Sequence, residues 1–178
     1  MIKSINFRKR LPFRLHICYY IIDILCKLGE VRPVENRIIL TSSTEETEEV
    51  GRSLAQSLVE SGKTTVFVAL YGDLGVGKTA FVRGFCSAVC PVARVKSPTY
   101  TVVNEYRGGT ADVFHFDMYR IDGEDDLYST GFYDYIDEGF ILSEWSENIP
   151  FAIPNEHIAV TIEKDGEDNR RITITDRT

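Results

Sequence analysis

The sequence predicts one α/β domain built as a three-layer sandwich, with a largely parallel sheet and a C-terminal β-hairpin, after an N-terminal extension. Three observations support this. Apolar strands alternate with amphipathic helices along residues 38–178. Residues 65–71 are nearly continuous in apolar side chains, which is typical of a parallel strand covered on both faces. A glycine-rich loop joins that strand to the next helix.

Composition agrees with an ordinary globular domain. Of the 178 residues, 43% are hydrophobic and 26% are charged, which excludes a disordered, collagen-like or coiled-coil chain. The four cysteines show no zinc-ligand spacing and favour a reducing compartment, so we expect a cytoplasmic protein. Cys86 and Cys90 lie one helical turn apart, and we interpret them as small core residues rather than a redox pair.

Two segments of the chain differ in charge. Residues 1–37 contain eight Lys and Arg against three Asp and Glu, whereas residues 38–178 contain twelve against twenty-four. The first segment is therefore a basic, partly apolar extension, and the second is the domain. The apolar run of the extension, about 14 residues, is shorter than the roughly 20 that span a bilayer, so it is not expected to cross a membrane, and no membrane partner is expected. A short basic amphipathic helix, weakly bound to a membrane or packed on the domain, would give this pattern, and so would a translation start placed too far upstream.

The first half of the domain is predicted as strand, helix, strand, loop and helix. A strand over 37–41 precedes a helix whose cap lies at 42–44, because acidic residues fill the turn that follows. Gly62 ends this helix, and the apolar strand over 65–71 comes next. A second helix runs over about 78–90 and stops before a proline.

The second half contains more strands. We expect strands over 100–106, 112–120 and 139–145, a helix over 124–135, and a terminal hairpin of 157–163 and 170–175. Strict alternation divides the second of these strands into two faces. Phe114, Phe116 and Met118 face a core, and Val113, His115, Asp117 and Tyr119 face the other way.

Residues 72–79, GDLGVGKT, fit the pattern G-x-x-x-x-G-K-S/T and lie between a buried strand and a helix start. Glycines let the backbone turn so that successive N–H groups point at phosphate oxygens, and the helix N-terminus adds positive potential. Lys78 supplies a mobile charge for the β- and γ-phosphates, and the Thr79 hydroxyl suits Mg²⁺. The sequence therefore predicts a nucleoside triphosphate site in a fold of the P-loop NTPase type.

Three further residues fit this site. Glu144 closes an apolar strand where the ligand crevice of an open α/β sheet lies, and its carboxylate suits a magnesium ion. Asp117 is a candidate for orienting the attacking water or for holding the metal through water. Thr99, next to a stiffening proline, is a candidate switch residue, although an ordinary turn explains it equally well. His115 is more simply a hydrogen-bonded structural residue.

Five blocks in fixed order closely resemble the TsaE family of small bacterial P-loop ATPases. They are GDLGVGKT, VKSPTYTVVNEY, FHFDMYR, EDDLYSTGFYDYID and ILSEWSENIP, within a resemblance from about Ile38 to Thr175. The resemblance implies an Mg-ATP-dependent ATPase, weak alone, that works with a TsaB–TsaD heterodimer. It implies a role in forming threonylcarbamoyladenosine at position 37 of ANN-decoding tRNAs. Since the domain is strongly acidic, tRNA is expected to be reached only through that complex.

The resemblance also assigns roles to residues. The expected nucleotide-binding residues are Thr44, Asp73, Gly75, Val76, Gly77, Lys78, Thr79, Ala80 and Trp145. Thr79 and Glu144 are expected to hold Mg²⁺, and Asp117, Thr99 and Lys78 to serve hydrolysis. Thr44 is assigned to the adenine end of the nucleotide.

Two other P-loop activities are weaker alternatives. A small-molecule or nucleotide kinase needs an arginine-rich lid, and here Arg94, Arg107 and Arg120 are widely separated. A GTPase-like switch usually contains an N-K-x-D block for guanine, and no asparagine of this chain is followed by lysine.

Overall fold

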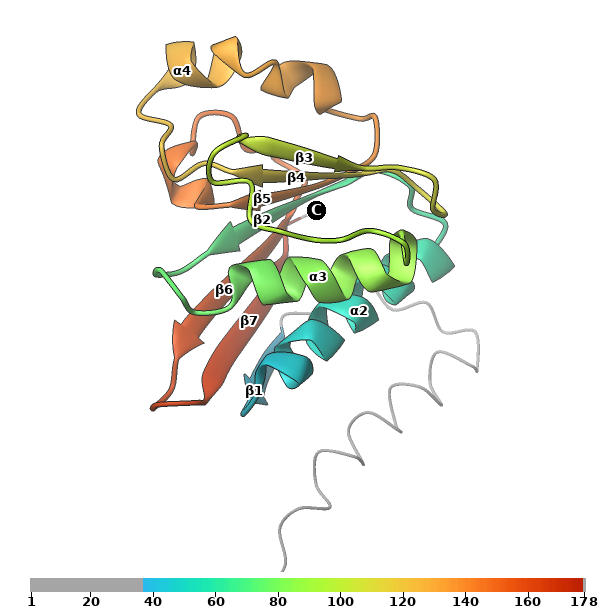
Figure 1. Cartoon of the computed structure of the whole chain (residues 1–178), viewed down its shortest axis with the longest axis vertical. Helices are drawn as coiled ribbons and strands as arrows, with labels where there is room; N and C mark the ends of the chain where they lie inside the picture. The colour runs from blue at the N-terminus through green and yellow to red at the C-terminus, as the bar shows by residue number, and fades with distance from the viewer. Residues whose placement is uncertain (1–36, 178) are drawn as a thin grey trace, which may run out of the picture. The chain divides into compact units, whose positions relative to one another are not determined.

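A computed structural model describes residues 37–177. Apart from Arg37, the predicted extension lies outside these residues. One seven-stranded sheet in the order β1-β7-β6-β2-β5-β4-β3 forms the middle of the domain (Figure 1). The strands are β1 (Arg37–Thr41), β2 (Val66–Tyr71), β3 (Val103–Tyr106), β4 (Val113–Asp117), β5 (Phe140–Glu144), β6 (Ile158–Lys164) and β7 (Arg170–Asp176). The helices are α2 (Thr44–Glu60), α3 (Lys78–Val89) and α4 (Glu124–Ser129), with short 3₁₀ turns η1 (Phe132–Tyr135) and η2 (Ser146–Asn148).

The four central strands, β6, β2, β5 and β4, run parallel, and both edges are antiparallel. The register pairs Leu70 with Glu144, and Glu144 in turn with Asp117. The carboxyl ends of β2, β5 and β4 therefore lie side by side, at the end of the sheet where its parallel strands finish. In open α/β sheets the ligand crevice lies outside these carboxyl ends. The predicted α/β sandwich with a largely parallel sheet and a C-terminal hairpin is confirmed.

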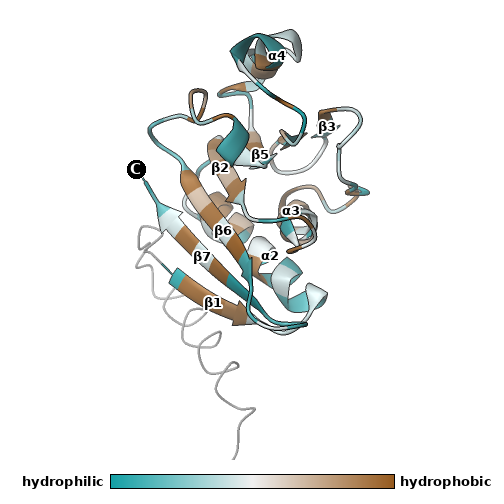
Figure 2. Cartoon of the chain, turned by 90° about the vertical axis from the view of Figure 1, so that its left-hand side faces the viewer, coloured by the Kyte–Doolittle hydropathy of each residue, from teal (hydrophilic) through white to brown (hydrophobic). Residues whose placement is uncertain are grey.

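Two apolar clusters hold the layers together. Helices α2 and α3 pack on one face of the sheet, and α4, η1 and the chain after η2 pack on the other (Figure 1). Alternation within β2 serves both, because Val68 and Leu70 belong to the first cluster and Phe67 and Ala69 to the second. Figure 2 shows the apolar residues as brown bands along β2, β6 and β7.

Three predicted elements are shorter in the structure, each for a local reason. The strand expected over 100–106 begins at Val103, because Thr101 and Val102 donate backbone hydrogen bonds to the Pro98 carbonyl (3.0 and 2.7 Å) in a tight turn. The strand expected over 112–120 ends at Asp117, whose carboxylate accepts the Tyr119 N–H at 3.1 Å and turns the chain.

The helix expected over 124–135 is interrupted. It consists of α4 and η1, separated at Gly131, whose φ of 72° is left-handed and stops a right-handed helix. The remaining predicted elements agree with the structure to within two residues, and the predicted cap of the first helix is Ser43, whose hydroxyl accepts the Glu46 N–H at 3.1 Å.

Cys86 of α3 and Cys90, the residue after its last turn, lie in the core, as predicted, and each is 1% exposed. The Cys90 thiol donates to the Arg107 carbonyl at 3.3 Å. Burial raises the pKa of the Cys86 thiol to about 12, so the thiol stays protonated and unreactive near neutral pH.

Helices α2 and α3 cross through two glycines. A Cβ atom at Gly84 would lie 1.7 Å from the Glu48 carbonyl oxygen, and one at Gly51 would lie 2.1 Å from the Phe81 carbonyl oxygen. Both neighbours are helix backbone, which cannot rotate aside as a side chain can. The close approach of α2 matters for the site, because Thr47 of this helix lies against the loop that precedes α3.

We therefore expect Gly84→Ala to lower the free energy of unfolding by about 2–3 kcal/mol, because the added methyl group must separate the two helices. Urea unfolding monitored by circular dichroism measures this change. Gly123→Ala is the matched control, since its backbone is extended and no atom lies within 4 Å of the added Cβ. Equal stability of the two variants would contradict the proposed backbone contact.

Candidate functional site

The loop between β2 and α3 is built from three glycines in conformations that other residues avoid. Gly72, Gly75 and Gly77 have φ values of 125°, 76° and 112°. Gly72 is also crowded, because a Cβ there would lie 2.2 Å from the Ile162 carbonyl oxygen. Gly77 is the N-cap of α3 and has no side chain to cover the first-turn N–H groups of the helix. The loop thus presents backbone N–H groups and a helix N-terminus, a combination that binds anions.

Residues that are distant in sequence contact this loop and hold it in place. Arg170, the first residue of β7, donates from Nε to the Val76 carbonyl at 3.0 Å. Thr47 lies 3.6 Å from the Cβ position of Gly77, and its hydroxyl forms a 3.0 Å hydrogen bond with the buried Thr41 hydroxyl. These contacts hold the loop in place by protein groups on its two sides.

Lys78 begins α3 and is 4% exposed. Its ammonium group donates to the carbonyl oxygens of Gly72 and of Asp73, the latter at 3.0 Å, and lies 3.8 Å from the centre of the Trp145 ring. Burial lowers the pKa of Lys78, while the nearby carboxylates of Glu144 and Glu147 oppose the shift. The charge therefore lies inside the loop, with an aromatic face beside it.

Thr79, the next residue, joins the loop to the sheet. Its hydroxyl donates to Glu144 Oε1 at 2.8 Å, and the same oxygen lies 2.8 Å from His115 Nε2. Both Glu144 and His115 are buried, 4% and 0% exposed. Within residues 37–177, Glu144 Oε2 has no hydrogen-bond partner. One carboxylate oxygen is thus held by protein groups and the other is available.

Asp117 lies beside Glu144 in the sheet register and is surrounded by hydroxyl groups. Its Oδ2 accepts from the Thr99 hydroxyl at 2.8 Å and from the Ser97 hydroxyl at 3.0 Å, and its Oδ1 accepts the Tyr119 N–H. A carboxylate has about four acceptor positions, so one position remains for a further donor. The segment 97–99 is therefore tied to the end of β4.

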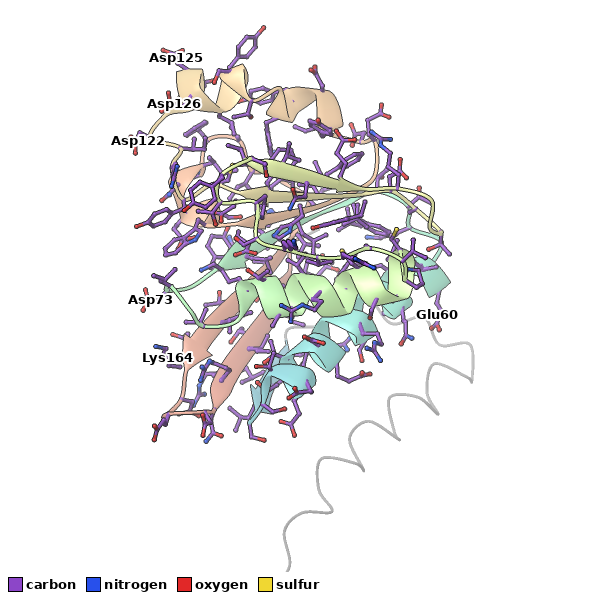
Figure 3. All side chains as sticks on the ribbon, viewed as in Figure 1. Glu60, Asp73, Asp122, Asp125, Asp126 and Lys164 are labelled. Carbon is purple, nitrogen blue, oxygen red and sulfur yellow. The ribbon has the colours of Figure 1, made fainter. Side chains whose placement is uncertain are left out.

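The other predicted site residues lie around Thr79, Glu144 and Asp117, and they differ in how far they are buried. Val76 and Ala80 are buried under the loop, whereas Gly75 and Asp73 are exposed, and Figure 3 shows the Asp73 side chain pointing outward. Trp145 follows β5 in a left-handed conformation (φ 59°), which turns its ring toward Lys78 and against Tyr119. Thr44 is an exposed residue in the first turn of α2, one turn before Thr47.

The donor set fits magnesium and a phosphate chain. Thr79 and Glu144 offer a hydroxyl and a carboxylate oxygen, and Mg²⁺ takes one or two such ligands together with water and phosphate oxygens. Residues 37–177 contain no group of three or more His, Cys, Asp and Glu side chains arranged for a metal ion. The same residues contain no helix long and apolar enough to cross a bilayer.

A strand, a glycine loop that leads into a lysine, and a helix, with a carboxylate at the end of the neighbouring strand, define a P-loop NTPase fold. The chain matches the family model for the threonylcarbamoyl adenosine biosynthesis protein TsaE over residues 41–172. It therefore belongs to the TsaE family, which takes part in tRNA threonylcarbamoyladenosine biosynthesis.

Comparisons with individual relatives support membership of the same family. The tRNA threonylcarbamoyladenosine biosynthesis protein TsaE of Bacillus subtilis is 35% identical over 125 residues, which cover 70% of this chain and 78% of the relative. The protein of the same name from Rickettsia felis is 33% identical over 138 residues, covering 77% and 78%. The crystal structure of YdiB from Bacillus subtilis superposes with a TM-score of 0.65 at 29% identity, covering 83% of this chain and 89% of YdiB.

Three contributors to the site were not assigned there from sequence. Arg170 is 94 residues from the carbonyl that it holds, and no local pattern links them. Ser97 shares Asp117 with Thr99, and its place in the same short segment was the available signal. His115 was interpreted as structural, and it does form a buried hydrogen bond, but its partner is the candidate metal ligand Glu144.

We expect His115→Ala to lower the free energy of unfolding by about 2–4 kcal/mol, because it leaves a cavity and removes a partner of a buried carboxylate. His115→Gln is the matched variant, since its amide nitrogen reaches the position of Nε2 and should recover about half of that loss. Urea unfolding measures both. Two variants of equal stability would show that the contact with Glu144 contributes nothing.

Proposed function

We propose that this chain binds Mg-ATP in the loop over residues 72–79 and hydrolyses it while acting with a TsaB–TsaD complex. The pathway in which it acts is the formation of threonylcarbamoyladenosine at position 37 of ANN-decoding tRNAs. Membership of the TsaE family supports the pathway, and the geometry of the loop supports the nucleotide.

The observation that carries the proposal is the hydrogen bond between Thr79 and Glu144. It brings together the hydroxyl of a phosphate-binding loop and the carboxylate of a neighbouring strand end, the two protein ligands that a P-loop site needs for its magnesium ion. Glu144 is also oriented by His115, so its free oxygen is fixed before any ligand arrives.

Each remaining residue has a distinct part in this proposal. Hydrogen bonds to the Gly72 and Asp73 carbonyls hold the Lys78 ammonium group within the loop. When the nucleotide binds, Lys78 exchanges these hydrogen bonds for contacts with phosphate oxygens. Asp117 accepts a hydrogen bond from the attacking water at its remaining acceptor position. Thr99 couples that carboxylate to the segment 97–99. When bound, Mg²⁺ neutralises charge on the phosphate oxygens.

The surface supports indirect contact with tRNA. Residues 38–178 contain twelve Lys and Arg against twenty-four Asp and Glu. Figure 3 shows Asp122, Asp125 and Asp126 at the exposed end that carries α4. Nucleic acid backbones need clustered positive charge, so a partner complex supplies the tRNA contact. A tRNA-modification role also supports a cytoplasmic location.

Calorimetric titration of the full chain with Mg-ATP tests nucleotide binding. We expect saturable binding, and we expect Lys78→Ala to weaken it about 100-fold or more, because a buried charge-assisted contact to phosphate is lost. Lys63→Ala, which removes an exposed lysine away from the loop, should bind as the parent does. If folded protein shows no heat of binding at saturating Mg-ATP, the chain is not an ATP-binding protein.

Phosphate release tests hydrolysis and partnership. The rate should be low for the chain alone and rise about tenfold or more with TsaB–TsaD, since a partner can complete the electrostatic environment of the phosphates. Glu144→Gln and Asp117→Asn should each lose about 100-fold while remaining folded. Glu163→Gln, at an exposed position of β6, is the control. If Glu144→Gln or Asp117→Asn keeps full ATPase activity, that residue has no part in hydrolysis. If TsaB–TsaD does not raise the rate, the proposed partnership is wrong.

A further inference from the structure

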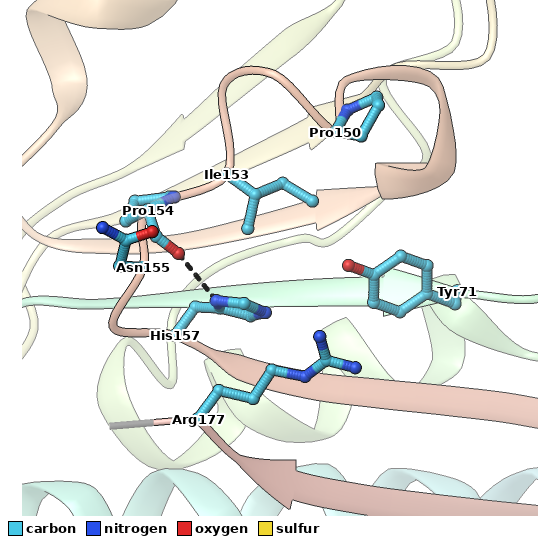
Figure 4. A pocket seen from close by; sticks show the side chains of 7 residues that line it. All are labelled: Tyr71, Pro150, Ile153, Pro154, Asn155, His157 and Arg177. Carbon is cyan, nitrogen blue, oxygen red and sulfur yellow. Dashed lines mark hydrogen bonds between the residues drawn. The ribbon is translucent and has the colours of Figure 1, made fainter.

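A hollow lies on the face of the sheet opposite to α3 (Figure 4). It has a volume of about 350 Å³ and is bounded by the end of β2, the chain between η2 and β6, and the end of β7. Its lining residues are Tyr71, Pro150, Ile153, Pro154, Asn155, His157 and Arg177. Tyr71 and Ile153 pack against the apolar cluster under α4, and none of residues 72–79 lines this hollow.

His157 turns an unpaired nitrogen toward this hollow. The imidazole is 7% exposed, and Nδ1 lies 2.7 Å from the Pro154 carbonyl oxygen. Because a carbonyl only accepts hydrogen bonds, Nδ1 carries the hydrogen, and Nε2 of the neutral ring offers a lone pair. Within residues 37–177 this buried Nε2 has no partner. Buried polar atoms are rarely left unpaired, so Nε2 offers an acceptor position for a ligand that donates an N–H or O–H.

Two donors face the same space. Figure 4 shows the Arg177 guanidinium and the Tyr71 hydroxyl directed toward the side of His157 that carries Nε2. The Arg177 backbone N–H donates to the His157 carbonyl at 3.0 Å, which places the two residues side by side. In the described part of the chain no carboxylate forms an ion pair with Arg177. Burial raises the pKa of the Tyr71 phenol, against the influence of Arg177, so the hydroxyl keeps its hydrogen.

These groups select among anions. A guanidinium and a phenol suit carboxylate oxygens, and the walls formed by Pro150, Ile153 and Pro154 suit an apolar body. Inorganic phosphate has no apolar body to place against the walls formed by Pro150, Ile153 and Pro154, and is disfavoured for that reason. A carboxylate next to an N–H satisfies all three polar groups.

We propose that the hollow binds an organic carboxylate with an adjacent N–H and an apolar side chain. In this arrangement Arg177 and Tyr71 hold the carboxylate, and His157 Nε2 accepts the N–H. Two sources share this chemistry: a small N-acylated amino acid, and the C-terminal residue of a peptide. The proposal does not depend on ATP binding, because none of its residues belongs to the loop over 72–79.

The probe is N-acetyl-L-leucine, added to the ¹⁵N-labelled full chain and followed by two-dimensional NMR. We expect saturable shifts centred on residues 71, 153–157 and 177. N-acetyl-L-leucinamide, which lacks the carboxylate, and 4-methylpentanoate, which lacks the N–H, should each bind about fivefold or more weakly. Folded protein without saturable shifts at about 50 mM probe would overturn the proposal, since that limit corresponds to almost no binding energy.

Variants assign the contacts. Arg177→Gln should weaken N-acetyl-L-leucine about tenfold. His157→Asn keeps a donor near the Pro154 carbonyl but removes Nε2, so it should reduce the affinity for N-acetyl-L-leucine to that for 4-methylpentanoate and leave the latter unchanged. Arg171→Gln, an exposed arginine of β7 paired with Asp165, is the control. Unchanged binding in Arg177→Gln, or equally tight binding of inorganic phosphate at these residues, contradicts the assignment.

A third comparison separates the two sources. An acetylated tripeptide ending in leucine that binds about tenfold tighter than N-acetyl-L-leucine supports capture of a peptide end. Equal affinity supports a small-molecule carboxylate. We expect Lys78→Ala, which should lose ATP binding, to give the same results as the parent in all these titrations. The two sites are therefore tested independently.

Discussion

The parallel pairing of β4, β5 and β2 is the constraint on which the site depends. These strands end together, so Asp117 and Glu144 become neighbours and both lie beside the first turn of α3. The hydrogen bond between Thr79 and Glu144 spans 65 residues and exists only in this register. A shift of β5 by one residue would turn Glu144 to the opposite face of the sheet. The chemistry of the site is thus a property of strand register as much as of the glycine loop.

The glycine loop itself is shaped by steric limits. Three left-handed glycines and a carbonyl 2.2 Å from the Cβ position of Gly72 leave little choice of residue there. The hydrogen bond of Val76 to Arg170 and the packing of Thr47 hold this strained path. Such outside support lets a loop present its N–H groups without reorganisation when a ligand arrives.

Local signals in the sequence predicted most of the fold. The continuous apolar strand over 65–71, the acidic first turn after Ser43 and the loop motif each act within a few residues, and each agrees with the structure. The interruption at Gly131 was missed, because a glycine within a helical pattern does not reveal its φ value. The candidate site residues Lys78, Thr79, Glu144, Asp117 and Thr99 do come together, whereas Arg170 could not be found, since only the tertiary fold connects it to Val76.

The order of the strands has a consequence for how the protein is made. The only strand partner of β1 in the described chain is β7, so the first strand of the domain pairs with the last. The arginine that steadies Val76 also belongs to β7. Until β7 has been made, therefore, the growing polypeptide has neither the strand that pairs with β1 nor the arginine that supports the glycine loop. Both are completed together once β7 has left the ribosomal exit tunnel.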